Sequence, residues 1–187
     1  MTEELKKITE HAEQIAIREN CYLYDLQLSG KGLGRSLRVF IDKDGEEGVS
    51  IDDCSRVSRG LDLVLDVEDL IPGGTYNLEV SSPGLERQLN QPWHYKKSVG
   101  QDVLINLNAG LGEIVEGRTG KDEKRKKLTA KLKLAGESAI EVILEGAEEG
   151  ENGDTVLIPY EFIHKARVVF TIESNKSLKK KTQSRKG

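Results

Sequence analysis

Side chains able to do covalent or metal chemistry are few and scattered in this 187-residue chain. The three histidines, His11, His94 and His164, lie far apart, and none has a partner at metal-ligand spacing. The two cysteines, Cys21 and Cys54, form no CxxC pair, which excludes a zinc site and a disulfide framework and fits a reducing cytoplasm. We therefore expect no catalytic residue, no metal site and no bound cofactor.

Residues 30–36 form a glycine-rich loop that invites comparison with phosphate-binding loops. Their order does not fit G-x-x-x-x-G-K-[ST], because Lys31 is followed by Gly32. The segment that follows has the alternation of a strand, whereas a phosphate loop leads into a helix whose backbone N–H groups converge on the anion. We interpret these residues as a flexible hairpin loop.

The segment with the densest set of unusual residues is a turn at residues 80–87. Pro-Gly is a favoured turn pair and the preceding serine hydroxyls can bond nearby backbone, so the simplest interpretation is structural. A binding role is the alternative, because an arginine can reach a phosphate or carboxylate and exposed hydroxyls can bond phosphate. The candidate binding residues are Ser81, Ser82, Pro83, Gly84 and Arg87.

Hydrophobic periodicity predicts a two-layer α+β domain over residues 1–90, in the order helix, strand, strand, helix, strand. The first helix is expected to start at Glu3 and Glu4 and to stop near Asn20, and the other elements are expected at residues 22–28, 37–41, 50–65 and 76–80. Alternation in the first strand places four side chains on one face, namely Tyr22, Tyr24, Leu26 and Leu28.

The second helix carries its own start signal. Ser50 can cap the helix while Asp53 reaches back to it, as in a capping box. We therefore assign Asp53 to capping rather than to acid–base chemistry, and Cys54 to the buried stripe of the helix rather than to nucleophilic chemistry.

The second half of the chain, after a linker at residues 90–100, shows almost only strand signals. With a one-turn helix near residues 160–163, these strands predict a small Sm-like or SH3-like β-barrel over residues 91–173. Residues 174–187 lack apolar periodicity and are expected to form a disordered basic tail. The five strands are expected at residues 103–107, 128–134, 140–144, 155–158 and 167–172.

The net charge of −4 hides an asymmetry along the chain. Residues 1–90 carry 10 Lys or Arg and 18 Asp or Glu, a balance of −8, which favours a basic partner. Residues 91–173 have a balance of −2, and residues 174–187 have six bases and no acid. Two basic runs could neutralise phosphates, although each could equally be a solvated surface. They are Lys124, Arg125, Lys126 and Lys127, and Lys179, Lys180 and Lys181.

The turn segment also carries a family resemblance. Residues 79–87, Glu-Val-Ser-Ser-Pro-Gly-Leu-Glu-Arg, resemble the start of the E-V-S-S-P-G-L-D-R-P-L signature of the bacterial ribosome maturation factor RimP. Two residues depart from this signature: Glu86 replaces Asp, and Gln88 replaces Pro. Ser98 also stands where an aromatic residue is common in the family. The resemblance spans both predicted domains, with further matches at residues 50–54, 57–59, 65–69, 99–100 and 158–160.

This resemblance implies an α+β N-terminal domain, a Sm-like C-terminal barrel and a protein that is not an enzyme. It further implies a cytoplasmic factor that assists small (30S) subunit assembly, with free 30S particles or their precursors, small-subunit ribosomal protein twelve and ribosomal RNA as partners. No apolar run is long enough to span a membrane, and nothing in the sequence requires more than a monomer. The alternative is a general Sm-like RNA-binding module acting on other RNAs, although the chain has few aromatic residues for base stacking.

Overall fold

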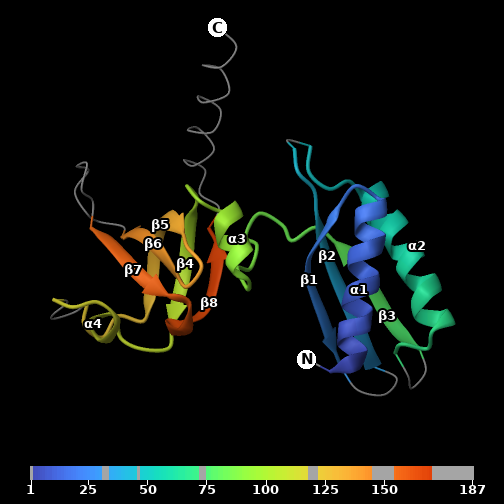
Figure 1. The fold of residues 1–187 in the computed structure, drawn as a ribbon, viewed down its shortest axis with the longest axis horizontal. Coiled ribbons are helices and arrows are strands. Elements are labelled where there is room, and N and C mark those ends of the chain that lie inside the picture. Colours follow the sequence, from blue (N-terminus) through green and yellow to red (C-terminus); the bar gives the residue numbers. More distant parts are fainter. Residues whose placement is uncertain are drawn as a thin grey trace, which may run out of the picture. The chain divides into compact units, whose positions relative to one another are not determined.

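The computed structural model describes residues 2–30, 34–45, 47–71, 75–117, 122–144 and 154–169. The chain divides into two compact units, Met1–Gly84 and Leu85–Gly187, which are drawn together in Figure 1. The sequence predicts a domain boundary at residue 90, and the compact units divide after Gly84. The expected tail at residues 174–187 lies outside the described residues.

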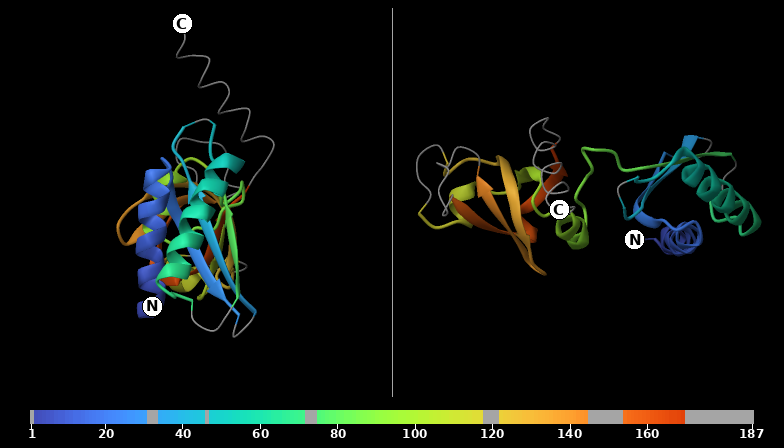
Figure 2. Two further views of the ribbon diagram at one scale, coloured as in Figure 1. Left: turned by 90° about the vertical axis from the view of Figure 1, so that its right-hand side faces the viewer. Right: turned by 90° about the horizontal axis from the view of Figure 1, so that it is seen from above.

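The first unit has the element order expected from the sequence, which is confirmed. Its three strands form one sheet in the order β1-β2-β3, with β1 antiparallel and β3 parallel to the central strand. Both helices cover the same face of this sheet (Figures 1 and 2), and their buried stripes form the core with the inward residues of the strands. The elements are α1 (Glu3–Arg18), β1 (Tyr22–Ser29), β2 (Arg35–Asp42), α2 (Ile51–Val67) and β3 (Tyr76–Ser81).

The expected face of β1 is wrong at its start. Leu23 packs against the core together with Leu26 and Leu28, and Tyr22 does not. The cause is a bulge between Leu23 and Asp25, where the register with β2 shifts by one residue. An extra residue in one strand moves every side chain before it to the opposite face, which simple alternation does not foresee.

The N-terminus of α2 is fixed by the capping box that the sequence predicts. The Ser50 Oγ accepts a hydrogen bond from the Asp53 backbone N–H at 3.1 Å. In return, the Ser50 N–H donates to the Asp53 Oδ2 at 3.0 Å. Two backbone donors that a helix start leaves unpaired are thereby satisfied, which sets where the helix begins.

The second unit is built on a five-stranded antiparallel sheet in the order β7-β6-β5-β4-β8. One face of the sheet buries a continuous apolar core that includes Ile105, Leu132, Ile140 and Ile158. β7 and β8 lie at the two ends of this order, so closure into a Sm-like barrel stays a prediction. The strands are β4 (Asp102–Leu107), β5 (Lys127–Ala135), β6 (Ala139–Leu144), β7 (Thr155–Pro159) and β8 (Ile163–Val168), with a 3-10 turn, η2 (Tyr160–Phe162), before β8.

Two short helices in this unit were not expected. The predicted linker at residues 90–100 contains α3 (Pro92–Lys97), and α4 (Leu111–Ile114) follows β4. The start of α3 depends on the buried His94, whose Nδ1 accepts the N–H groups of Asn90 and Gln91 at 3.0 and 3.2 Å. A six-residue helix capped by a ring nitrogen has too few turns to show a helical apolar period.

The last strand also differs from the expectation at residues 167–172. β8 begins at Ile163, directly after the 3-10 turn, and ends at Val168. The register with β4 shifts near its start, since Leu107 faces Ile163 while Asn106 faces Lys165. This irregularity around the exposed His164 breaks the apolar alternation, so the first half of the strand carries no strand signal.

Replacing the cap tests this account of α2. We expect Ser50→Ala to destabilise the first unit by about 1 kcal/mol, because it removes the side-chain acceptor of the helix start. In a domain of this size that corresponds to a fall in Tm of about 4–8 °C in a thermal denaturation followed by circular dichroism.

The control is Ser55→Ala one turn later, where the exposed hydroxyl only donates to the Ile51 carbonyl at 2.9 Å. That change should cost less than about 0.5 kcal/mol. Equal Tm values for Ser50→Ala and the wild type would contradict the account.

Candidate functional site

The serine-rich turn begins where β3 ends. Ser81 is the last residue of β3 and faces Phe40 of β2, and both Ser81 and Ser82 are exposed. Gly84 has a φ of +77°, a conformation that favours glycine, and a side chain there would meet open space. The positive φ of Gly84, and not crowding by neighbouring atoms, therefore favours glycine at this position. The side chains of Ser81 and Ser82 are exposed to solvent.

Arg87 belongs to the second unit, where its backbone is paired with β8. The Arg87 carbonyl accepts the Val168 N–H at 3.0 Å, and the Leu89 N–H donates to the Ala166 carbonyl at 2.8 Å. Gln88 lies between them and forms an antiparallel bridge with Arg167. The end of the signature thus runs as a short added strand beside β8, and this pairing fixes the half-buried Arg87 in place.

A side-chain contact reinforces this added strand. The Arg167 Nη1 binds the Glu86 Oε2, one residue before Arg87. Glu86 is the position at which this chain departs from the Asp of the family pattern. Glu86 keeps the negative charge of Asp on a longer side chain, and it forms an ion pair with Arg167 of β8.

The basic run at residues 124–127 leads into β5: residues 124–126 lie in the preceding loop, and Lys127 is the first residue of the strand. Its backbone supports α4, because the Arg125 carbonyl accepts the Leu111 N–H at 3.0 Å. Two of its cations are partly engaged: the Arg125 Nη1 lies 3.6 Å from the Asp122 Oδ1, and the Lys126 Nζ donates to the Asn108 carbonyl at 3.3 Å.

The other two cations of this run are Lys124 and Lys127, and both are exposed. Within the ranges that the structure describes, neither has a carboxylate partner. They are therefore the members of the run best placed to meet an external anion. The second predicted basic run, Lys179–Lys181, lies outside the described residues.

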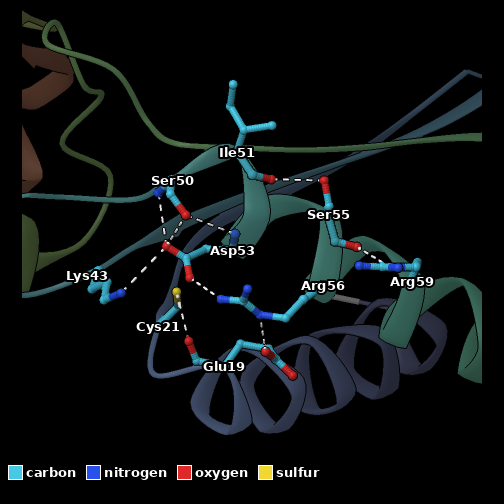
Figure 3. Close-up of polar contacts among 9 residues, drawn as sticks. All are labelled: Glu19, Cys21, Lys43, Ser50, Ile51, Asp53, Ser55, Arg56 and Arg59. Atoms are coloured by element: carbon cyan, nitrogen blue, oxygen red, sulfur yellow. Dashed lines mark hydrogen bonds and ion pairs between the residues drawn. The ribbon is translucent and has the colours of Figure 1, made fainter.

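A polar network at the start of α2 is richer than the sequence suggests (Figure 3). Asp53 is buried, with its side chain only 4% exposed, yet it binds four groups. Besides the two groups of Ser50, the Arg56 Nη2 lies 2.5 Å from its Oδ1, and the Lys43 Nζ lies 3.6 Å from its Oδ2. The Arg56 Nε also donates to the Glu19 Oε2 at 2.7 Å, which ties α2 to the end of α1.

This network holds Asp53 in its charged form. The N–H of Ser50, then its hydroxyl, and then the charges of Lys43 and Arg56 lower the pKa of Asp53, against the opposing effect of burial. An acid held below its usual pKa is a poor proton donor or acceptor near neutral pH. The Ser-x-x-Asp spacing predicts the cap but not the cations around it. Arg56 lies three residues after Asp53 on α2, whereas Lys43 directly follows β2 and is outside the helix.

The cysteines are also in environments unsuited to nucleophilic chemistry. Burial raises the pKa of Cys54, and the neighbouring charge of Asp53 raises it further. The pKa of the buried Cys21 is raised by the same two causes in the same order. Because the thiolate is the reactive form, both thiols are kept unreactive near neutral pH.

Among the described residues, no group of three or more His, Cys, Asp or Glu side chains is arranged to hold a metal ion. None of the described helices is long and apolar enough to cross a membrane.

Comparison with known families decides the relationship of the first unit. Residues 11–86 match the family model described as the RimP N-terminal domain. This match supports the RimP family for the first unit. The RimP N-terminal domain indicates a family of ribosome maturation factors, and the match extends from α1 to the Glu86 of the signature turn.

A pair of carboxylates on α2 lies on the acidic surface of this first unit. Asp62 and Asp66 lie one turn apart on the exposed side of the helix, and the Tyr76 hydroxyl donates to both, at 3.4 and 3.0 Å. Burial, followed by the two carboxylates, raises the pKa of Tyr76, so the hydroxyl remains a donor. Like charges at this spacing destabilise a helix, and the tyrosine only partly offsets the repulsion.

The lowered pKa of Asp53 predicts how the stability of the first unit responds to acid. A carboxyl with a depressed folded-state pKa stabilises the fold above its ordinary pKa of about 4, and this stabilisation is lost as pH falls through the folded-state value. Asp53→Asn should therefore be less stable than the wild type at pH 7 but lose less stability between about pH 5 and pH 3.

Urea denaturation across this pH range provides the measurement. The matched control is Asp52→Asn, at the exposed neighbouring carboxylate, which should keep the wild-type pH dependence. An unchanged acid slope in Asp53→Asn would contradict the role given to the network.

Proposed function

We propose that this RimP-family protein is a non-enzymatic, monomeric, cytoplasmic factor that assists assembly of the small (30S) ribosomal subunit. The observation that carries the proposal is the match of residues 11–86 to the RimP N-terminal domain, together with the signature turn at residues 79–87. In this proposal the protein binds free 30S particles or their precursors. It acts by holding a ribosomal protein and immature ribosomal RNA, without a cofactor.

The acidic first unit supports a basic protein partner. Residues 1–90 have a charge balance of −8, and exposed acids such as Asp62 and Asp66 give the helical face negative charge. An acidic surface speeds encounter with a basic protein and disfavours a nucleic-acid duplex. We propose small-subunit ribosomal protein twelve as this partner.

The contacts to RNA are proposed at positions where cations or hydroxyls face solvent. Lys124 and Lys127 are exposed and can neutralise phosphates, while Ser81 and Ser82 offer hydroxyls as donors. Arg87 is held by its backbone and is proposed to contact a phosphate or carboxylate. The remaining proposed residues are Pro83, Gly84, Arg125, Lys126, Lys179, Lys180 and Lys181.

Association of the purified full-length protein with free 30S subunits tests the proposal directly. We expect co-sedimentation with immature 30S particles at low salt, and an affinity that falls steeply as salt rises, because phosphate neutralisation releases counterions. A short unstructured RNA should bind more weakly than the particle.

The opposite order of affinities would favour the alternative, a general Sm-like RNA-binding module. Failure to associate with free 30S subunits at low salt would overturn the proposal. A bound metal or cofactor in the purified protein would speak against a non-enzymatic factor.

The basic loop makes a separate, quantitative prediction. The double change Lys124→Gln and Lys127→Gln should reduce the slope of log affinity against log salt by about 2, one for each lost phosphate contact. The measurement is a titration of fluorescent protein with 30S particles at several salt concentrations.

The matched control makes the same charge change at two exposed lysines of α1, Lys6→Gln with Lys7→Gln. This control lies on the acidic unit and should leave the slope unchanged. Equal slopes for both double variants would remove residues 124–127 from the RNA interface.

A further inference from the structure

The two outer strands of the first sheet differ in regularity. β1 is interrupted by the bulge between Leu23 and Asp25, and a bulge is one of the devices that keep an edge strand from pairing further. β3 pairs with β2 in unbroken register over Tyr76–Ser81. Among the described residues, no strand lies beyond β3. Its outward backbone N–H and C=O groups therefore form a regular row with which a further strand can pair.

The side chains of β3 do not obstruct this edge. Residues 72–74, which are outside the described ranges, precede the strand, so the edge is considered from Asn77 onward. Glu79 is the one charged residue of β3, and it is already paired: its Oε2 lies 2.8 Å from the Arg38 Nε, and its Oε1 accepts the Asn77 Nδ2–H at 3.2 Å. The strand itself thus has no free charge that would keep an added strand away.

Two carboxylates of α2 border the same edge. α2 connects β2 to the parallel strand β3 and packs against β3, so the helix runs back along the strand. The Tyr76 hydroxyl of β3 donates to Asp62 and Asp66, which places both acids on the β3 side of the helix. In the part of the chain that the structure describes, neither carboxylate has a Lys or Arg partner, whereas Asp53 of the same helix has two.

The spacing of these two acids matches that of an extended chain. Asp62 and Asp66 are one helical turn apart, which is about 6 Å at 1.5 Å per residue. Alternate residues of a strand are about 6.5–7 Å apart and project to the same face. A strand added beside β3 with Lys or Arg at alternate positions would therefore direct one cation to each carboxylate. This pairing would also relieve the repulsion between the two like charges on α2.

The same charges disfavour other occupants of this edge. Two copies of the chain pairing through β3 would bring Asp62 and Asp66 of one copy beside those of the other, which is unfavourable. The phosphates of a nucleic acid would meet the same repulsion. An extended basic segment is the class of ligand for which both the backbone groups and the charges are complementary.

We propose that the outer edge of β3, from Asn77 to Ser81, binds an extended basic segment as an added strand, with alternate Lys or Arg side chains on Asp62 and Asp66. This inference deepens the proposed function and rests on it, because a basic protein partner is proposed there for the first unit. It adds the place of contact, the extended conformation of the bound segment and the alternation of its cations.

A synthetic peptide tests the alternation. The peptide has the length of β3, alternates Lys and Thr, and has blocked termini. We expect it to bind the full-length protein about threefold to tenfold more tightly than a peptide of the same composition with consecutive lysines, because alternation places the cations on one face. The measurement is the Kd from isothermal titration calorimetry at low salt. Equal affinities would overturn the inference, since net charge alone would then account for binding.

The two carboxylates are tested by the double variant Asp62→Asn with Asp66→Asn. It should bind the alternating peptide about threefold to tenfold more weakly, as expected for the loss of two exposed ion pairs. The matched control, Glu10→Gln with Glu13→Gln, removes two exposed charges from α1, which packs against β1, and should bind like the wild type. An equal loss in both double variants would overturn the inference.

Methylation of the peptide nitrogens tests the backbone pairing. In an added strand, alternate N–H groups point toward β3 and the others point to solvent. Two alternating peptides are compared, each N-methylated at one of the two sets of alternate residues. One should lose affinity about tenfold or more, and the other should keep it. Equal effects of the two methylation patterns would overturn the added strand.

Hydrogen–deuterium exchange of the wild-type protein locates the contact. The alternating peptide should slow exchange of amides within Asn77–Ser81 and leave the amides of β1 unchanged. Protection of β1 in place of β3 would overturn the inference. Slowed exchange at β3 that rises with protein concentration without peptide would identify a second copy of the chain as the occupant, and slowed exchange with a short single-stranded RNA would identify a nucleic acid. Either result would overturn the inference.

Failure of this inference is distinguishable from failure of the proposed function. If the alternating peptide does not bind, the inference is overturned, while co-sedimentation with free 30S subunits still decides the proposed function. If the protein does not associate with 30S subunits, the proposed function is overturned, and the basic partner on which this inference rests is lost with it.

Discussion

The backbone pairing of residues 87–89 with β8 is the interaction on which the second unit most depends. It satisfies the outward Ala166 carbonyl and Val168 N–H, anchors the chain where it enters this unit, and sets the position of Arg87. The Glu86–Arg167 ion pair adds a side-chain tie at the same place. The end of the signature turn is therefore a structural part of the sheet as well as a candidate binding segment.

The first unit carries acidic side chains both in its interior and on its surface. Inside, Asp53 stays charged because Ser50, Lys43 and Arg56 surround it, and the same arginine reaches Glu19 to join the two helices. Outside, Asp62 and Asp66 are left largely to solvent, with the Tyr76 hydroxyl as a shared donor. Negative charge is thus neutralised at the helix start and retained on the helix surface, where a basic protein could use it.

Much of this architecture could be predicted from periodicity and capping chemistry. The order of elements in the first unit and the capping box at Ser50 and Asp53 follow from local patterns, because alternation and i,i+3 spacing are local properties. The bulge in β1, the irregular start of β8 and the helix capped by His94 could not be predicted. The first two depend on how one strand pairs with another, and the third depends on a single side chain that replaces a backbone partner. None of these is visible in the periodicity of one segment. For the same reason, Arg87 was recognisable as unusual, but its pairing with β8 was not.

The topology of the two sheets also has a consequence for the order in which the chain folds as it is synthesised. Every contact of the first sheet lies within residues 22–81, so this unit has all its strands as soon as β3 has emerged. In the second sheet the first strand, β4, pairs with the last, β8, and the added strand at residues 87–89 also waits for β8. Such long-range closure is slow relative to local pairing. The nascent protein thus passes through an interval in which an acidic N-terminal unit with all its strands precedes a sheet that still lacks β8.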